Sequence, residues 1–311
     1  MERRLYVIIA LIITGFVSCQ KDQGEIPSYI YIPDIRLTTT SAQGSTSDDI
    51  IDAWVYVDDN PVGCFPLPAR VPVLAEGNRK ISVYGGIKAD GISTRRRRYI
   101  FYQPFVTNSF TLRRGMVDTL KGVFEPVVSY YPSNQITIWY EDFTDPFVPF
   151  FQDAISDTTI NRITDPGEVF EGAGCGLLTL SATQNFVQVA TSENFDLPKG
   201  GIPVYLELNY KANQAFAVGL RSIYPGNILN QENTIIRDTY DDNGVLVWKK
   251  IYCEFTELVS SNINAISHEI FFRVYKDQGV SVPQVYIDNV RLIYGNRSEE
   301  RRVGKECRSR W

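Results

Sequence analysis

The single histidine, His268, limits the catalytic chemistry that this sequence can support. A nucleophile–histidine–acid triad needs a histidine as its base, and many metal centres need two or three histidines as ligands. His268 stands next to Glu269 at the start of an alternating, strand-like run. We therefore predict that it is structural, and we exclude a histidine-dependent triad and a multi-histidine metal site.

Two other patterns resemble a phosphate-binding loop and a pair of catalytic carboxylates, but neither is sufficient evidence of catalysis. The run Gly172-Ala173-Gly174-Cys175-Gly176 is rich in glycine like a phosphate-binding loop, but no helix is expected after it to supply N-terminal amides. We predict a turn before a strand over 177–180. Several acidic residues could be paired for glycoside hydrolysis, which depends on a carboxylate separation that sequence does not give: Glu141, Asp142, Glu171 and Glu207. The prediction is a protein that is not an enzyme, with a glycoside hydrolase as the less favoured alternative.

Aromatic side chains provide the other binding chemistry. An exposed ring can stack on a sugar ring, and a few amide or carboxylate groups add hydrogen bonds. Five aromatic residues fall opposite the apparent core face of a strand or beside a strand end, and these are the candidate ligand-binding residues: Trp139, Tyr140, Tyr205, Trp248 and Tyr252. The competing interpretation is that each is an ordinary core residue.

These candidates lie in residues 136–296, where period-two runs predict strands. In the run 204–210, Val204, Leu206, Leu208 and Tyr210 share one face, which we predict to be the core face. Asn243-Gly244 predicts a hairpin between 234–240 and 245–255. Eight to ten such strands without a convincing helix predict a β-sandwich of the jelly-roll type.

The first and last strands of this segment carry a resemblance. Glu141-Asp142-Phe143 and the closing run Val285-Tyr286-Ile287-Asp288-Asn289-Val290-Arg291-Leu292 resemble the outer strands of jelly-roll carbohydrate-binding modules. The resemblance implies a structural calcium ion bound by the carboxylates of Glu141, Asp142 and Asp288. The alternative is that Asp288-Asn289 forms a β-bulge or local side-chain hydrogen bonds.

Residues 29–126 form a separate pattern of short strands and turns. Within it, residues 53–87 resemble the small PEGA-like, Ig-like β-sandwich domains of envelope proteins. The resemblance lies in the order of the elements, which is a strand at 53–57, an Asp-rich turn, a Leu-Pro pair and a second alternating strand. That resemblance implies a spacer or surface-binding module without catalytic residues. Pro126 and Pro132 bound the predicted linker, residues 127–135. The predicted fold class is thus all-β, with a PEGA/Ig-like sandwich followed by a jelly roll.

The N-terminus predicts where the protein works. Residues 1–18 have a charged start and a short apolar run, the pattern of a secretory signal, and Phe16-Val17-Ser18-Cys19 resembles a bacterial lipobox. The resemblance implies lipidation of Cys19, followed by a polar tether over 19–28. Lys21-Asp22 partly resembles a signal for export to the cell surface. The alternative is an ordinary signal peptide in which Cys19 is coincidental.

Residues 297–311 are excluded from the prediction of the fold, because they resemble a translated sequencing adapter and show no apolar period. A natural basic tail is the alternative. The whole chain carries a net charge of −5, and this tail is basic, so the rest is more acidic still, which argues against a nucleic-acid partner.

Three cysteines remain between Cys19 and this tail: Cys64, Cys175 and Cys253. An odd number in an exported protein cannot all pair internally. Cys253 alternates with apolar residues and is predicted to be a buried thiol, while a Cys175–Cys253 disulfide stays open.

These features predict an outer-membrane lipoprotein, lipid-anchored and displayed at the cell surface, with a non-catalytic, glycan-binding accessory role. The predicted partners are membrane lipid through Cys19 and a carbohydrate, and calcium is the one candidate ion. The alternative is a structural or adhesive component of a surface assembly that binds protein.

Overall fold

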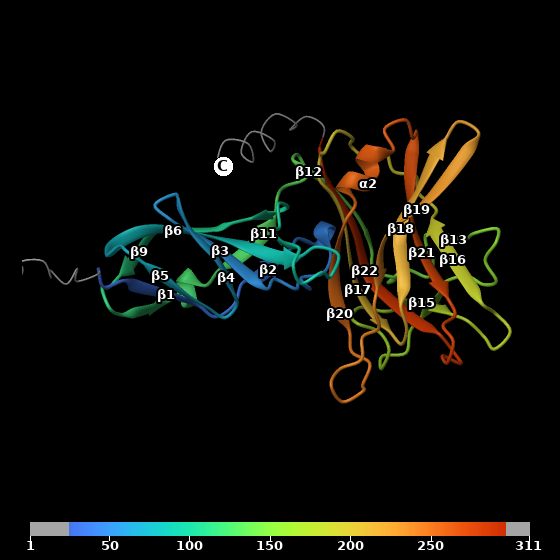
Figure 1. Cartoon of the computed structure of the whole chain (residues 1–311), viewed down its shortest axis with the longest axis horizontal. Coiled ribbons are helices and arrows are strands. Elements are labelled where there is room, and N and C mark those ends of the chain that lie inside the picture. The colour runs from blue at the N-terminus through green and yellow to red at the C-terminus, as the bar shows by residue number, and fades with distance from the viewer. Residues whose placement is uncertain (1–24, 297–311) are drawn as a thin grey trace, which may run out of the picture.

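The computed structural model describes residues 25–296 and is built almost entirely from β-strands, which confirms the predicted all-β fold class (Figure 1). The first domain contains β1 (Ser28–Ile32), β2 (Arg36–Thr38), η1 (Ser41–Gln43), β3 (Asp52–Val57), β4 (Asn60–Pro66), β5 (Ala69–Val73), β6 (Gly77–Lys88), β7 (Arg96–Arg98), β8 (Tyr102–Gln103), β9 (Phe105–Leu112), β10 (Val117–Thr119), η2 (Gly122–Phe124) and β11 (Val127–Tyr130). The second contains β12 (Ile136–Glu141), β13 (Phe150–Gln152), β14 (Asn161–Ile163), β15 (Cys175–Thr179), β16 (Phe186–Thr191), β17 (Val204–Ala212), β18 (Phe216–Tyr224), β19 (Asn227–Ile236), β20 (Lys249–Glu254), α2 (Thr256–Ser261), β21 (Ser267–Tyr275) and β22 (Gln284–Gly295).

The first domain is a β-sandwich of three sheets around one core. The largest has the order β4-β3-β6-β7, with β9 also paired to β6, and the two others are β10-β1-β5 and β2-β11-β8. Alternation along β3 buries Ala53, Val55 and Val57 in the core. The turn after β3 uses positive φ angles at Asp58 and Asp59. Strand β11 pairs with β2 and β8, so the predicted linker over 127–135 is wrong in its first four residues.

The second domain is a two-sheet sandwich. The proximal sheet has the order β14-β15-β22-β17-β20 with β12 paired to β22, and the distal sheet has the order β13-β16-β21-β18-β19. The predicted core face of β17 is confirmed, because Val204, Leu206, Leu208 and Tyr210 all lie in the core between the sheets. The short helix α2 has no counterpart among the predicted elements.

The predicted hairpin at Asn243-Gly244 is only partly correct. The turn exists, with Gly244 at φ +78° and its N–H donating to the Asp241 carbonyl at 3.0 Å. However, β19 belongs to the distal sheet and β20 to the proximal sheet, and the only bridge flanking the turn joins Tyr240 to Leu246. Strand β19 pairs with β18 and strand β20 pairs with β17, so the chain crosses from the distal sheet to the proximal sheet at this turn.

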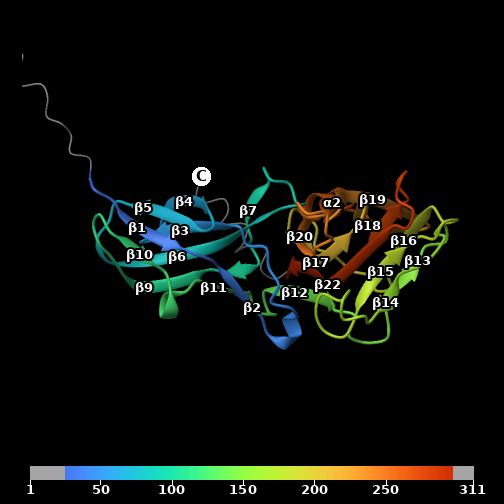
Figure 2. The ribbon, with the colours of Figure 1, turned by 90° about the horizontal axis from the view of Figure 1, so that it is seen from below.

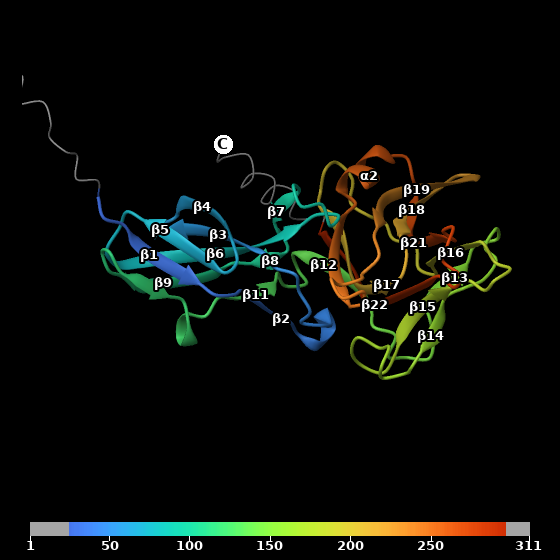
Figure 3. The same cartoon turned by 60° about the horizontal axis from the view of Figure 1, so that its bottom comes forward.

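The outer face of the proximal sheet packs against the first domain, whereas the distal sheet faces away from it (Figures 1, 2 and 3). Tyr205, Tyr252 and Ile293 of the second domain belong to the hydrophobic core cluster of the first. The end of β6 continues onto β20 through a bridge between Ala89 and Tyr252. The two domains therefore share buried surface and backbone hydrogen bonds.

A charged cluster lies within this domain contact. The Glu207 carboxylate accepts hydrogen bonds from the Tyr99 hydroxyl at 2.6 Å and the Tyr130 hydroxyl at 2.8 Å. It also pairs with Arg291 at 2.8 Å and with Lys250 at 3.2 Å. Glu207 and Arg291 are fully buried, so each depends on these partners for the solvation that water would otherwise provide.

The arginine run at 95–98 adds ion pairs at the edge of the same contact. Arg95 bridges Asp90 of the first domain and Glu254 of the second, and Arg96 pairs with Asp52. Arg98 stacks on the Tyr84 ring at 4.6 Å. The run thus contributes to the connection between the domains.

None of the helices within residues 25–296 has the length and apolar character needed to span a bilayer.

Candidate functional site

Strand register brings aromatic and polar side chains together on the outer face of the distal sheet, which we call the distal face. Phe186 pairs with Tyr275, Gln188 with Arg273 and Ala190 with Phe271 across β16 and β21. Directly paired residues point to the same side of a sheet. The intervening residues Val187, Val189, Phe272 and Val274 belong to the core, so the first set points outward.

Polar side chains form a continuous chain of contacts across this face. Gln188 donates to Asp153 at 2.9 Å, and Arg273 donates to Gln188 at 2.6 Å. Arg273 also pairs with Glu232 on β19 at 2.7 Å. Arg221 on β18 joins the other end, at 3.1 Å from Asp153 and 3.4 Å from Glu269. The resulting chain runs Glu232, Arg273, Gln188, Asp153, Arg221, Glu269.

These polar groups are held rigidly. Gln188 is fully buried although it points away from the core, and Arg221, Arg273 and Glu269 are largely buried. Burial raises the pKa of Glu269, and Arg221 opposes that shift. Side chains fixed by their neighbours lose little rotamer entropy when a ligand binds, so the distal face is preorganised for hydrogen bonding.

Aromatic rings flank the polar chain at both ends. The Phe186 and Tyr275 rings lie 4.8 Å apart, and Tyr275 is 58% exposed. The Arg273 guanidinium stacks 4.7 Å from the centre of the Phe271 ring and covers it, while Arg221 lies 5.2 Å from the Phe151 ring. Among these rings Tyr275 is the exposed one, Phe186 and Phe151 are half-buried, and Phe271 is fully buried. An exposed ring beside fixed carboxylate and guanidinium groups is a composition that can bind an uncharged ring with many hydroxyls.

Two of the five predicted ligand-binding residues are buried in the domain contact. Tyr205 is 5% exposed and Tyr252 is 1% exposed. The Tyr99 ring of the first domain packs edge-on against both, at 5.4 and 5.0 Å. A stacking role for Tyr205 and Tyr252 is therefore wrong, because neither ring has a face that a sugar could reach.

Trp139 and Tyr140 on β12 also have structural contacts. The Trp139 indole packs against the core of the second domain, with Phe195 at 5.4 Å. The Tyr140 hydroxyl donates to Asn289 and accepts from the Ser45 N–H at 3.1 Å, and burial raises the Tyr140 pKa to about 12. Both side chains are thus engaged in contacts within the protein, and neither lies on the distal face.

Trp248 keeps a partly accessible position. Its ring lies 5.5 Å from Phe170 and 6.4 Å from Tyr286, and the Lys211 ammonium lies 5.4 Å from its centre. Lys211 is in turn paired with Glu168. This cluster lies beside the proximal sheet, and a ligand-binding role for Trp248 stays a prediction.

The predicted calcium ligands do not converge. Among residues 25–296, no group of three His, Cys, Asp or Glu side chains could hold a metal ion. Glu141 accepts from the Phe143 N–H at 2.6 Å and Asp142 from the Thr144 N–H at 2.9 Å, so both carboxylates fix a turn. Asp288 is buried and accepts from the Asn289 N–H at 2.8 Å.

Two further features fix the backbone around these carboxylates. Arg162 donates to the carbonyls of Phe143, Thr144 and Ala173, and so supplies the positive charge that links the turn to the loop before β15. Asn289 has φ +50°, and the register of β17 and β22 shifts between Glu207 and Asn209. The alternative prediction of a β-bulge at Asp288-Asn289 is thus confirmed.

Other sequence predictions have clear outcomes. His268 is buried, and its Nδ1 lies 3.0 Å from the Ser222 hydroxyl, as expected of a structural residue. Cys64, Cys175 and Cys253 are free thiols, which answers the open disulfide question, and Cys253 is buried as predicted. The glycine run before β15 forms a turn that leads into that strand. Cys19 and residues 297–311 lie outside the described residues.

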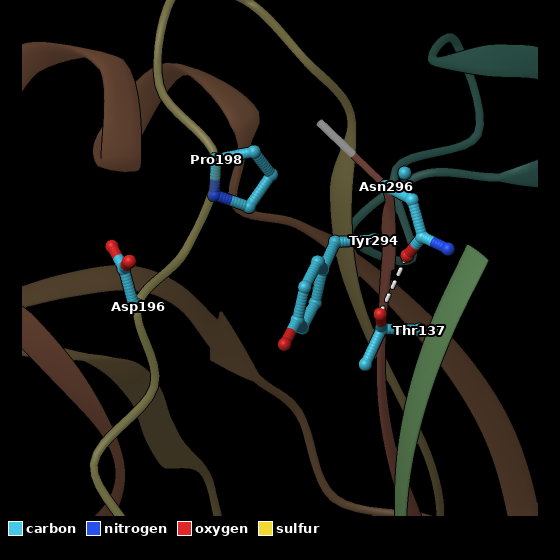
Figure 4. A pocket seen from close by; sticks show the side chains of 6 residues that line it. Thr137, Asp196, Pro198, Tyr294 and Asn296 are labelled. Atoms are coloured by element: carbon cyan, nitrogen blue, oxygen red, sulfur yellow. Dashed lines mark hydrogen bonds between the residues drawn. The ribbon is translucent and has the colours of Figure 1, made fainter. Parts of the chain in front are cut away.

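A pocket of about 330 Å³ lies beside the last described residue and is lined by Thr137, Asp196, Pro198, Tyr294, Gly295 and Asn296 (Figure 4). The Thr137 hydroxyl donates to the Asn296 side-chain oxygen at 2.6 Å across one wall. The pocket offers one carboxylate and one aromatic ring, a poorer set of binding groups than the distal face.

No family model matches the chain, and no curated protein matches it. Among solved structures, the K3 cleaved adhesin domain of Lys-gingipain from Porphyromonas gingivalis is similar over 51% of this chain and 98% of that chain, with 13% identity and a TM-score of 0.35. The family 30 carbohydrate-binding module of a cellulosomal cellulase from Clostridium thermocellum is similar over 51% of this chain and 91% of that chain, with 15% identity and a TM-score of 0.32.

The enzymatically active domain of a tailspike protein from bacteriophage CBA120 also matches, with 12% identity and a TM-score of 0.37, over 50% of this chain and 20% of that chain. Several of the matched structures are thus carbohydrate-binding modules. At these identities and TM-scores, the matches assign neither a family nor a ligand to this chain.

Proposed function

We propose that this chain is a non-catalytic glycan-binding protein and that its binding site is the distal face. The observation that supports the proposal best is the Phe186–Tyr275 pair, in which Tyr275 is exposed and Phe186 half-buried, beside the rigid Arg273–Gln188–Asp153 chain. The Tyr275 ring would stack on a sugar ring, and the accessible parts of Arg273 and Glu232 would bind hydroxyls, with Gln188 buried beneath them as a support. The proximal sheet supports such a role less well, because the first domain covers much of its outer face.

The charged groups of the distal face fit binding better than hydrolysis. Glycoside hydrolysis needs one carboxylic acid that is protonated and a second carboxylate that acts as base or nucleophile. Asp153 and Glu269 both contact Arg221, at 3.1 and 3.4 Å. Both carboxylates are thus engaged in positioning Arg221, and we propose no catalytic role for them.

The test is binding of the full chain to a panel of soluble polysaccharides by affinity electrophoresis. We expect at least one polymer to retard the protein, and Tyr275→Ala to weaken the binding that causes this retardation about tenfold. The control is Tyr240→Ala, which removes a tyrosine of similar exposure, 47%, from the connection between β19 and β20. Weakened binding in the control, or binding by Tyr275→Ala that equals the parent's, would place the site elsewhere.

We also propose that Cys19 anchors the chain by lipid to the outer membrane, with the binding face displayed at the cell surface. The support is the apolar run that ends at Cys19 and the polar segment after it. In addition, the described chain begins at the end of the first domain that is remote from the distal face (Figure 1). Cys19→Ala should release the protein from membranes and stop incorporation of a labelled fatty acid, whereas incorporation that persists would contradict the proposal.

A protein partner is the second candidate function, and one observation favours it. Ile228 pairs with Ile223, whose carbonyl accepts from the Ile266 N–H at 2.7 Å, so exposed Ile228 and Ile266 lie near one another. Such an apolar patch can dock protein. A panel that finds no polysaccharide ligand for folded protein would favour this alternative.

A further inference from the structure

The charges of the distal face specify which class of glycan it can accept. Its two guanidinium groups are both engaged, since Arg221 contacts Asp153 and Glu269 while Arg273 pairs with Glu232. An acidic sugar is usually bound by an arginine or lysine that is free to pair with its carboxylate. In each guanidinium two of the three nitrogens already have a partner, so a sugar carboxylate could pair with two nitrogens only by displacing one of these partners. Displacing a partly buried carboxylate leaves it without its cation, which is costly.

The surroundings of the aromatic pair are also unfavourable to an acidic ligand. Asp157 lies beside Phe186 and accepts from its N–H at 3.0 Å. Lys276, which follows Tyr275, donates to the carbonyls of Ser181 and Ala182, at 3.1 and 3.4 Å. The contacts named on this face involve four carboxylates and three cations, and the whole chain carries a net charge of −5. The local and global fields therefore both disfavour a polyanion.

The distal face is also longer than one sugar ring. Phe186 and Ala190 stand four residues apart on β16, and Phe151 is paired with Ala190 across β13. At about 3.3 Å per residue, the aromatic pair and Phe151 are separated by roughly 13 Å along the strand. The polar chain fills the space between them.

We infer that the distal face binds an extended, uncharged polysaccharide and discriminates against glycans that carry carboxylates. This inference rests on the proposed function and adds the class of ligand. Uncharged hydroxyls can accept from the outer edges of the two guanidinium groups and donate to the carboxylates without displacing either. An extended chain would contact both aromatic ends at once.

The test compares neutral polymers, namely hydroxyethylcellulose, galactomannan and dextran, with the uronate polymers polygalacturonate and alginate. The full chain is used at 50 and 500 mM NaCl. We expect retardation by a neutral polymer that changes less than twofold with salt, because screening affects only charged partners. Retardation by a uronate polymer that disappears in high salt would overturn the inference and leave the proposed function standing. No retardation by any polymer, from folded protein, would overturn both.

A charge variant gives an independent readout. Glu232→Gln frees Arg273 from its ion pair, and we expect this variant to gain measurable, salt-sensitive binding to polygalacturonate, at least threefold above the parent. The matched control is Glu257→Gln, which removes an exposed carboxylate on α2, outside the distal sheet. An equal gain in both variants would show that the net charge of the protein alone determines binding to polygalacturonate. That result would overturn the inference that the distal face discriminates against carboxylates.

Discussion

Glu207 lies at the centre of the buried charged cluster between the two domains. Its carboxylate pairs with both Arg291 and Lys250, and it also accepts from Tyr99 and Tyr130 of the first domain. The two positive charges favour its ionised form, so the pKa of Glu207 is lowered although burial opposes the shift. A buried ion cluster of this kind is sensitive to the loss of one partner.

Glu207→Gln should therefore be strongly destabilising. The change leaves Arg291 and Lys250 buried with no negative charge between them, and we expect a loss of about 3 to 5 kcal/mol in the free energy of unfolding. Urea denaturation at pH 7 measures it. The exposed Glu257→Gln serves as the control and should change stability by less than about 0.5 kcal/mol. A Glu207→Gln loss as small as that of the control would contradict this view of the cluster.

For Lys250 we predict the opposite effect on stability, because its buried charge is a cost to the folded state. Burial lowers its pKa to about 8 in the folded protein, against an ordinary lysine value near 10.5. Below pH 8 the lysine is charged in both states, and the folded state bears the cost of burying that charge. Between about pH 8 and 10.5 the unfolded chain holds more protons, so stability should rise with pH across this window.

Lys250→Met should then be at least as stable as the parent at pH 7, because Glu207 keeps Arg291 and two tyrosines as partners. Its advantage should shrink as the pH rises toward 10, since the parent loses the buried charge. Denaturant unfolding at pH 7, 8.5 and 10 gives the comparison. A variant less stable than the parent at pH 7, with the gap closing at high pH, would show that the Lys250 charge is stabilising.

At the scale of elements, β17 shows how far the sequence predicts the fold. Its alternation correctly assigns Val204, Leu206 and Leu208 to the core. The opposite residues, Tyr205 and Glu207, look the same in sequence whether they face water or another domain. Because the first domain covers them, their burial depends on long-range contacts that local alternation does not contain.

The distal face was missed for a related reason. The strands at 186–190 and 268–276 are visible as apolar alternation, and Phe186 and Tyr275 stand out of phase with the core residues. What the sequence lacks is the register that pairs Phe186 with Tyr275 and Gln188 with Arg273. Aromatic residues at strand ends, out of phase with the core, were the signal that could have found them.

The glycine that ends η1, Gly44, packs directly against the second domain. Gly44 has φ +79°, and a Cβ there would overlap the Tyr140 ring of the second domain. Gly44→Ala should cost about 2 kcal/mol or more, from backbone strain plus overpacking. Gly200→Ala is a matched control, because Gly200 has the same φ and open space around it. Thermal unfolding of the two variants should separate the steric overlap with Tyr140 from the backbone strain that both variants share. Equal losses of stability would contradict a close fit at Gly44.

At the scale of the whole molecule, the two domains should unfold as one unit. The core cluster of the first domain includes Tyr205, Tyr252 and Ile293, and the buried charges lie between the domains. A fragment of residues 136–296 would expose those apolar groups and leave Arg291 without the carbonyls of Gln43 and Ser45. We expect the fragment to be less stable than the full chain and to aggregate.

Calorimetry of the full chain measures this coupling directly. One transition, with equal calorimetric and van't Hoff enthalpies, is the expected result. Two separated transitions, the second matching that of the isolated 136–296 fragment, would show that the domains are independent.

The central claim is that glycan binds the distal face and that the proximal sheet is occupied in holding the domains together. The most direct test is calorimetric titration of Tyr275→Ala and Trp248→Ala, side by side with the parent, using the polysaccharide that the panel identifies. We predict that Tyr275→Ala weakens binding about tenfold, the effect of losing one stacked ring, while Trp248→Ala binds like the parent. Normal binding by Tyr275→Ala together with loss in Trp248→Ala would contradict the claim and move the site to the cluster around Trp248.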